Sequence, residues 1–207
     1  PKTRFILILE KVRRFIMNEK IAKVIRFATI PPIMAAVLLL ILALAGTDNV
    51  SAQNLCFHFV FLTVLPISSY PVARLIPILK NRGRPFERKL AIIFCLLGYV
   101  GSVSTAIFAH GVTVEKIMSL TYLLSGAITA LLSAFKFRSS GHACGFAGPI
   151  FLLSYAVSPW FTAGFALLAP IFWASLTLKR HTFSELVCGT LVPLVSLLAS
   201  IFVFGGF

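Results

Sequence analysis

Charged side chains are scarce in this sequence, and acidic ones are the scarcest. Only 12% of the residues are charged, and six acids stand against nineteen Lys and Arg. Soluble domains are about a quarter charged. The hydrophobic share of 58% and the mean hydropathy of +0.96 therefore exclude an ordinary soluble domain. They predict an all-α fold, a polytopic transmembrane helical bundle.

The sequence also lacks paired cysteines and carboxylate clusters. Cys56, Cys95, Cys144 and Cys188 lie singly in or beside apolar runs. This is typical of small packing residues rather than of zinc ligands or a disulfide framework. Because no pair of carboxylates lies near a histidine, a metal-dependent enzyme is disfavoured. We therefore expect no metal and no cofactor.

The chain divides into two regions. Residues 1–26 are basic and amphipathic, which predicts an interfacial helix whose cations face anionic lipid headgroups. Residues 27–207 are expected to form one transmembrane bundle. Its apolar runs lie at residues 28–46, 55–79, 90–109, 117–135, 143–157, 161–178 and 182–204. We expect about six or seven spans, depending on the division at Ser158-Pro159, since a span needs roughly 17 to 25 residues.

The net charge of +13 is interpreted as a sign of membrane orientation and of an anionic lipid partner, not of nucleic-acid binding. The cations gather where the second, fourth and sixth runs end, and the opposite loops contain one cation, Lys116. Basic residues collect on the cytoplasmic side. The expected location is a bacterial inner membrane with the basic face in the cytoplasm. A phosphate site would concentrate cations in the same way and is the alternative cause.

Two histidines follow these cations. His142 ends the stretch Lys136-Phe-Arg-Ser-Ser-Gly-His, and His181 follows Lys179-Arg180. The predicted topology places both at the same face as the basic loop of residues 80–89. Ionisable groups at a membrane rim are costly and are therefore candidates for function.

This set of residue types suits phosphate-ester hydrolysis, which needs cations for the phosphoryl oxygens, a nucleophile and an acid. Neutral imidazole is a competent nucleophile near pH 7, and a neighbouring carboxylate fixes its tautomer. Residues four apart share a helix face, so Glu185 is expected one turn from His181. A plain alternative for Glu185 is a capping box with Thr182.

The motifs resemble those of the PAP2 superfamily, the type 2 phosphatidic acid phosphatases. Ser140-Gly141-His142 is similar to the core of the second motif, and the segment from His181 to Gly189 is similar to the third. The resemblance implies that His181 is a nucleophile forming a phosphohistidine and that Glu185 orients it.

The same resemblance implies that His142 protonates the leaving oxygen and that Ser140 and Gly141 contact the phosphate. The match departs from the family in its cations. The first motif has Arg84-Pro85 without its lysine, and Ser175 stands where the third motif has arginine. We expect the charge to come from other positions, namely Lys80, Arg84, Lys136, Arg138 and Arg180.

The sequence thus predicts a metal-independent membrane phosphatase acting on a lipid phosphate or pyrophosphate. Two alternatives stay open: a noncatalytic relative that binds or transports lipid, and a structural subunit of a membrane complex. The oligomeric state is not predicted.

Overall fold

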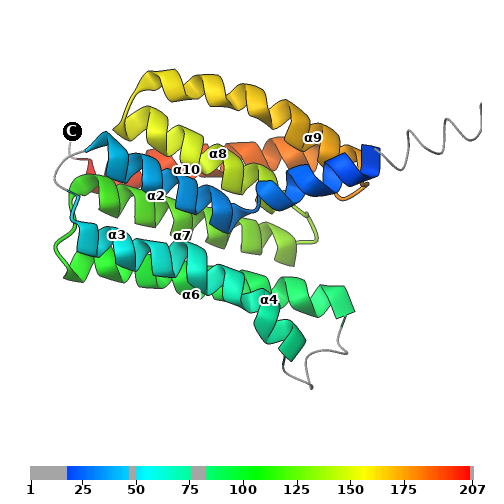
Figure 1. Cartoon of the computed structure of the whole chain (residues 1–207), viewed down its shortest axis with the longest axis horizontal. Coiled ribbons are helices and arrows are strands. Elements are labelled where there is room, and N and C mark those ends of the chain that lie inside the picture. Colours follow the sequence, from blue (N-terminus) through cyan, green and yellow to red (C-terminus); the bar gives the residue numbers. More distant parts are fainter. Residues whose placement is uncertain (1–17, 47–49, 76–82, 206–207) are drawn as a thin grey trace, which may run out of the picture.

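The computed structural model describes residues 18–46, 50–75 and 83–205, and every regular element in these ranges is helical. This confirms the expected all-α bundle, whose helices run side by side in Figure 1. The elements are α2 (Pro31–Ala45), α3 (Ala52–Phe59), the π-helical turn η2 (Val60–Val64), α4 (Leu65–Leu75), α6 (Gly83–Phe108), α7 (Thr113–Ala134), α8 (Gly141–Ala156), the 3₁₀ segment η3 (Pro159–Leu167), α9 (Leu168–Thr177) and α10 (Phe183–Phe204).

Five of the described helical segments are long and apolar enough to cross a membrane: Ala52–Leu75, Lys89–Phe108, Thr113–Ala134, Pro159–Thr177 and Phe183–Phe204. A sixth arises if the helix Asn18–Ala28 and α2, bent by 51° at a short break, form one span. The 16-residue α8 is shorter than the roughly 17 residues that a span needs. The described residues therefore contain five candidate spans, or six if the bent pair is one span, and six is the lower end of the expected range.

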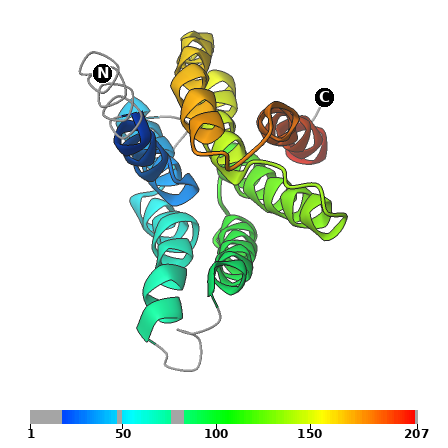
Figure 2. The same ribbon diagram turned by 90° about the vertical axis from the view of Figure 1, so that its right-hand side faces the viewer.

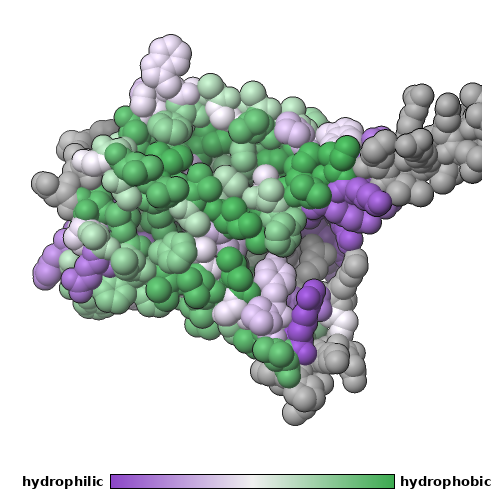
Figure 3. Space-filling view, viewed as in Figure 1, coloured by the Kyte–Doolittle hydropathy of each residue, from purple (hydrophilic) through white to green (hydrophobic). Residues whose placement is uncertain are grey.

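The surface of the bundle is apolar along most of its length. Large hydrophobic side chains such as Leu44, Phe108 and Phe202 are exposed. In Figure 3 the hydrophilic residues gather toward the two ends, and the middle is hydrophobic. This distribution fits an integral membrane protein, because lipid and not water surrounds the middle of such a bundle.

The expected interfacial helix is described only in part, because residues 1–17 lie outside the described ranges. The helix Asn18–Ala28 exposes Ile21, Val24 and Phe27 and buries Ala22. Pro31 and Pro32 then begin α2, where a missing backbone N–H costs least.

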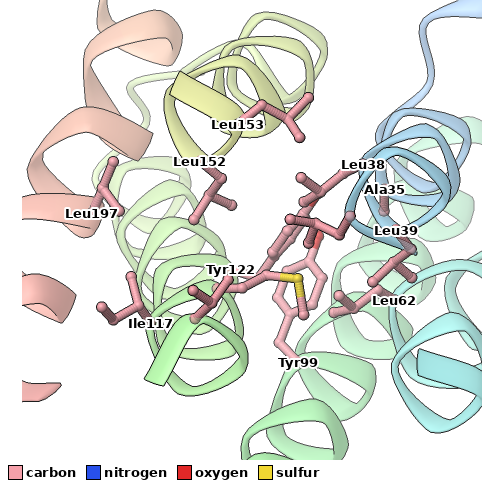
Figure 4. Close-up of a cluster of buried hydrophobic side chains, with 13 residues drawn as sticks. Ala35, Leu38, Leu39, Leu62, Tyr99, Ile117, Tyr122, Leu152, Leu153 and Leu197 are labelled. Carbon is pink, nitrogen blue, oxygen red and sulfur yellow. The ribbon is translucent and has the colours of Figure 1, made fainter. Parts of the chain in front are cut away.

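Helix α7 lies at the centre of the packing. It packs against α6 and α10, while α8 packs against α2 and α10 (Figure 2). Figure 4 shows the core between these helices, where Leu38, Tyr122 and Leu152 meet. The rings of Tyr99 and Tyr122 are tilted by 52°, with centroids 5.5 Å apart. This core holds the C-terminal half of α8 through Leu152 and Leu153.

A buried polar cluster lies around the first turn of α7, at the opposite end from the residues that join α7 to α8. Glu115 Oε2 accepts hydrogen bonds from the Val112 backbone N–H at 2.7 Å and from Asn54 Nδ2 at 3.1 Å. His58 Nδ1 lies 2.9 Å from Ser102 Oγ. These contacts connect α3, α6 and α7, and His58 forms the interhelical bond typical of an intramembrane histidine.

Candidate functional site

Two hydrogen bonds tie together the segments that carry the two histidines. These segments join α7 to α8 and α9 to α10, at the same end of the bundle (Figure 1). The Ser140 backbone N–H donates to the Glu185 backbone oxygen at 3.0 Å, and His181 Nδ1 lies 3.2 Å from the Arg138 backbone oxygen. Gly189 permits this approach, because a Cβ there would lie 2.5 Å from the Ser140 backbone oxygen. The structure therefore brings the two predicted motifs together.

The hydrogen bonds of His181 define which of its nitrogens carries a proton. Nδ1 lies 3.0 Å from Glu185 Oε2 as well as 3.2 Å from the Arg138 backbone oxygen. A carboxylate and a carbonyl only accept hydrogen bonds, so Nδ1 must be the donor. In the neutral imidazole the lone pair is then on Nε2.

Glu185 also caps α10. It is therefore both the expected neighbour of His181 and the glutamate of the capping box with Thr182. Its Oε2 accepts from the Thr182 backbone N–H at 3.1 Å, and Thr182 Oγ1 accepts from the Glu185 N–H at 3.3 Å. His181 lies before the N-cap rather than inside the helix. One carboxylate thus fixes both the start of α10 and the orientation of the imidazole in front of it.

Burial lowers the pKa of His181 below its ordinary value of 6.5. The hydrogen bond and negative charge of Glu185 act to raise that pKa, and the positive charge of Arg26 acts to lower it. The net shift is downward, so the neutral imidazole dominates at neutral pH.

His142 lies in the first turn of α8 and contacts an arginine from the N-terminal helix. Arg26 Nη2 is 3.3 Å from His142 Nδ1, and Arg26 Nη1 donates to Ser175 Oγ at 2.8 Å. A guanidinium has no acceptor, so Nδ1 accepts and the ring proton is on Nε2. Arg26 therefore joins α8 and α9 to the helix Asn18–Ala28.

A cavity of about 560 Å³ begins at these residues and runs into the bundle. Both histidines, Arg26, Arg180 and Gly141 line it at the basic end. The other walls come from α2, α4, α6, α7 and α8 and are largely apolar: Pro32, Pro66, Ile92, Leu96, Tyr99 and Leu152. Such a cavity suits an amphiphile with an anionic head, since polar groups fix the head and apolar walls accept the chain.

Four buried hydroxyls in the cavity wall have no oxygen or nitrogen partner among the described residues: Tyr122, Ser125, Thr129 and Ser139. The first three lie on α7 at helical spacing, which places them along one face. Cys144, on α8, interacts with Ser125 and Thr129 but is a weak hydrogen-bonding group. These hydroxyls give one wall of the cavity a polar stripe.

The other predicted site residues differ in their placement. Ser140 is fully buried and is the N-cap of α8, where its Oγ accepts from the Ala143 N–H at 3.4 Å. Lys136 and Arg138 are exposed and do not line the cavity, although Arg138 contributes its backbone oxygen to His181. Arg84 begins α6, but its side chain is not described, and Lys80 lies outside the described residues.

No three His, Cys, Asp or Glu side chains in the described ranges are grouped to hold a metal ion. The cavity is lined by both histidines, by the cations Arg26 and Arg180 and by Glu87, and Glu185 contacts His181. The cations and carboxylates balance in number, so it is the position of Arg26 beside His142, and not the net charge, that suits a phosphate group there.

Arg26 was not among the site residues predicted from the sequence. It is separated from His142 by 116 positions and from Ser175 by 149. One signal existed in the sequence: Ala22 and Arg26 are four residues apart and share a helix face. The buried Ala22 shows that this face is turned toward the bundle. The sequence alone did not show which face of a basic helix would be buried.

Comparison with known proteins yields no match to a protein family, to a curated protein or to a solved structure.

Proposed function

We propose that the protein is a membrane lipid phosphatase of the PAP2 type, which hydrolyses a lipid phosphate or pyrophosphate through a phosphohistidine. The tautomer of His181 carries this proposal. Its Nδ1 is held by Glu185 and by the Arg138 backbone oxygen. Its Nε2 therefore keeps a lone pair, and the ring lines the same cavity as His142, Arg26 and Arg180.

In the first step His181 Nε2 attacks the phosphorus, and the bond from phosphorus to the leaving oxygen breaks. The attacking imidazole becomes positively charged, and Glu185 stabilises that charge through Nδ1–H. Protonated His142 transfers its Nε2 proton to the leaving oxygen. In the second step His142 takes a proton from water and the water oxygen attacks the phosphorus. The bond from phosphorus to His181 Nε2 breaks, which releases inorganic phosphate and restores the neutral imidazole.

The substrate that fits is an amphiphile held partly in the membrane. The apolar walls of the cavity suit an acyl or prenyl chain, and the basic end suits its phosphate. We place this end on the cytoplasmic side of a bacterial inner membrane, because the cations gather there.

The test is phosphate release by the detergent-solubilised protein, with phosphatidate and a polyprenyl pyrophosphate as substrates. His181→Asn should lower the rate at least about 10³-fold, since both steps use its ring. His110→Asn is the matched control, because His110 is exposed at the far end and has a positive φ that Asn tolerates. Phosphate release by His181→Asn at the wild-type rate would refute the proposal.

Ser175 favours a second candidate, a noncatalytic protein that binds a lipid phosphate. It stands where the resemblance expects an arginine, and the cation at this place comes instead from Arg26. Lipid-phosphate binding by the wild type without turnover, and unchanged binding by His142→Ala, would support this candidate.

A further inference from the structure

Among the described residues, Arg26 is the cation whose side chain contacts one of the two histidines. It comes from the segment expected to be an interfacial helix. Its guanidinium lies 3.3 Å from His142 Nδ1 and 2.8 Å from Ser175 Oγ. It also lines the cavity that contains both histidines. Burial is the main cause that lowers the pKa of His181, and the positive charge of Arg26 acts in the same direction.

We propose that Arg26 is the phosphate-binding arginine of the site. Bound phosphate then releases Arg26 from His142, so that His142 can become protonated and act as the acid. This inference rests on the proposed function for the catalytic step, but the binding of phosphate by Arg26 is independent of turnover. It makes the helix Asn18–Ala28 part of the site and not only an anchor.

The guanidinium of Arg26 is held in a fixed position at the end of the cavity. Ser175 is fully buried on α9 and holds Nη1, so the guanidinium is fixed between α9 and α8. An arginine presents several N–H donors in one plane and binds phosphate oxygens in pairs. With Nη1 held by a buried hydroxyl, Nη2 lies beside His142 at the end of the cavity where the phosphate must lie for attack by His181.

The contact with Arg26 determines whether His142 can carry a second proton. Arg26 donates to Nδ1, and an imidazolium has no lone pair there to accept. The acid form of His142 and this hydrogen bond therefore exclude each other. A doubly charged phosphate is a better acceptor than a neutral imidazole, since a hydrogen bond between two charged groups is the stronger one. Bound phosphate takes Nη2 from His142, and the freed Nδ1 can take up a proton.

This arrangement gives the free enzyme a neutral His142 and gives the complex a protonated one. Phosphate binding should therefore be accompanied by proton uptake. Because inorganic phosphate carries the same oxygens as the substrate head, it can serve as the probe without knowledge of the lipid.

The experiment measures the thermal stabilisation of the purified full chain by inorganic phosphate in detergent. Arg26→Gln should weaken phosphate binding about 10- to 100-fold, and Arg26→Lys should weaken it less. Lys23→Gln is the matched control, because Lys23 lies on the same helix, is exposed and pairs with Glu19. Calorimetry in buffers of different ionisation enthalpy should show proton uptake in the wild type and a smaller uptake in Arg26→Gln.

The outcomes separate this inference from the proposed function. If no lipid substrate is hydrolysed but phosphate binding depends on Arg26, the proposed function fails and the role of Arg26 in binding stands. A wild type that phosphate does not stabilise, or an Arg26→Gln variant stabilised equally at each concentration, would overturn the inference. Equal proton uptake by the wild type and Arg26→Gln would overturn the proposal that phosphate binding leads to protonation of His142.

Discussion

Nδ1 of His181 lies 3.0 Å from Oε2 of Glu185, and the same oxygen accepts the Thr182 N–H that begins α10. The imidazole is therefore oriented by a group that is itself fixed at a helix terminus. Glu185 thus stabilises the start of α10 and also orients the His181 imidazole that is proposed to react.

The two functions of Glu185 can be separated by substitution. Glu185→Gln should retain the helix cap, because glutamine also accepts from the N-cap N–H. It should lower phosphate release about 10²-fold or more, since the charge that stabilises the His181 imidazolium is lost. Glu185→Ala should lose activity as well and destabilise the fold by about 0.5–2 kcal/mol. Thermal unfolding and phosphate release measure the two effects, and a Glu185→Gln variant with full activity would contradict the assigned role.

The acid limb of the pH profile should follow His181, and the need for a protonated His142 should give a decline at alkaline pH. The reaction needs a neutral His181 imidazole and the pKa of His181 is lowered, so the acid limb should lie below pH 6.5. Glu185 raises this pKa and Arg26 lowers it. The acid limb of kcat/KM should therefore move to lower pH in Glu185→Gln and to higher pH in Arg26→Gln. Shifts in the same direction in both variants would contradict this electrostatic account.

Gly189→Ala should separate the two histidine segments. Its Cβ would lie 2.5 Å from the Ser140 backbone oxygen and 3.0 Å from the Ser140 nitrogen, so α10 must shift. We expect a loss of about 1–3 kcal/mol in the free energy of unfolding and lower activity. Gly148→Ala is the matched control, because its Cβ would meet Pro193 at an ordinary 3.5 Å. Equal thermal stability of the two variants would contradict the close packing described.

Glu115 should stabilise the fold without affecting catalysis. In Glu115→Ala, the Val112 N–H and the Asn54 amide lose their acceptor, which costs about 1–3 kcal/mol for each buried group left unpaired. Glu115→Gln keeps an acceptor oxygen and should cost less. Thermal unfolding measures this, with activity per folded molecule as the control. A large loss of that activity in Glu115→Ala would show that the far-end cluster takes part in the reaction.

The features that follow from nearby residues were predictable from the sequence. His181 and Glu185 are four positions apart, so the spacing alone predicted their contact, and the structure adds the capping hydrogen bond. The helical bundle followed from the apolar runs. The short α8 was harder to interpret, because packing around it rather than its length determines that it lies within the bundle.

The features that depend on tertiary packing were not predictable. Arg26 reaches the site from a helix more than a hundred positions away, and only the burial of Ala22 shows which face of that helix is turned inward. Ser140 was expected to contact the phosphate. The structure places its hydroxyl in the cap of α8, fully buried, because the packing of α10 against Ser140 covers it.

The central claim is that Nε2 of His181 becomes phosphorylated. Its most direct test is rapid mixing of the protein with phosphatidate or polyprenyl pyrophosphate, radiolabelled in the transferred phosphate, followed by an alkaline quench that preserves the nitrogen–phosphorus bond. We predict labelled protein that loses its label in acid, with the label on His181 in the wild type and none in His181→Asn. Rapid phosphate release with no label on His181, or a label of equal amount in His181→Asn, would contradict the account.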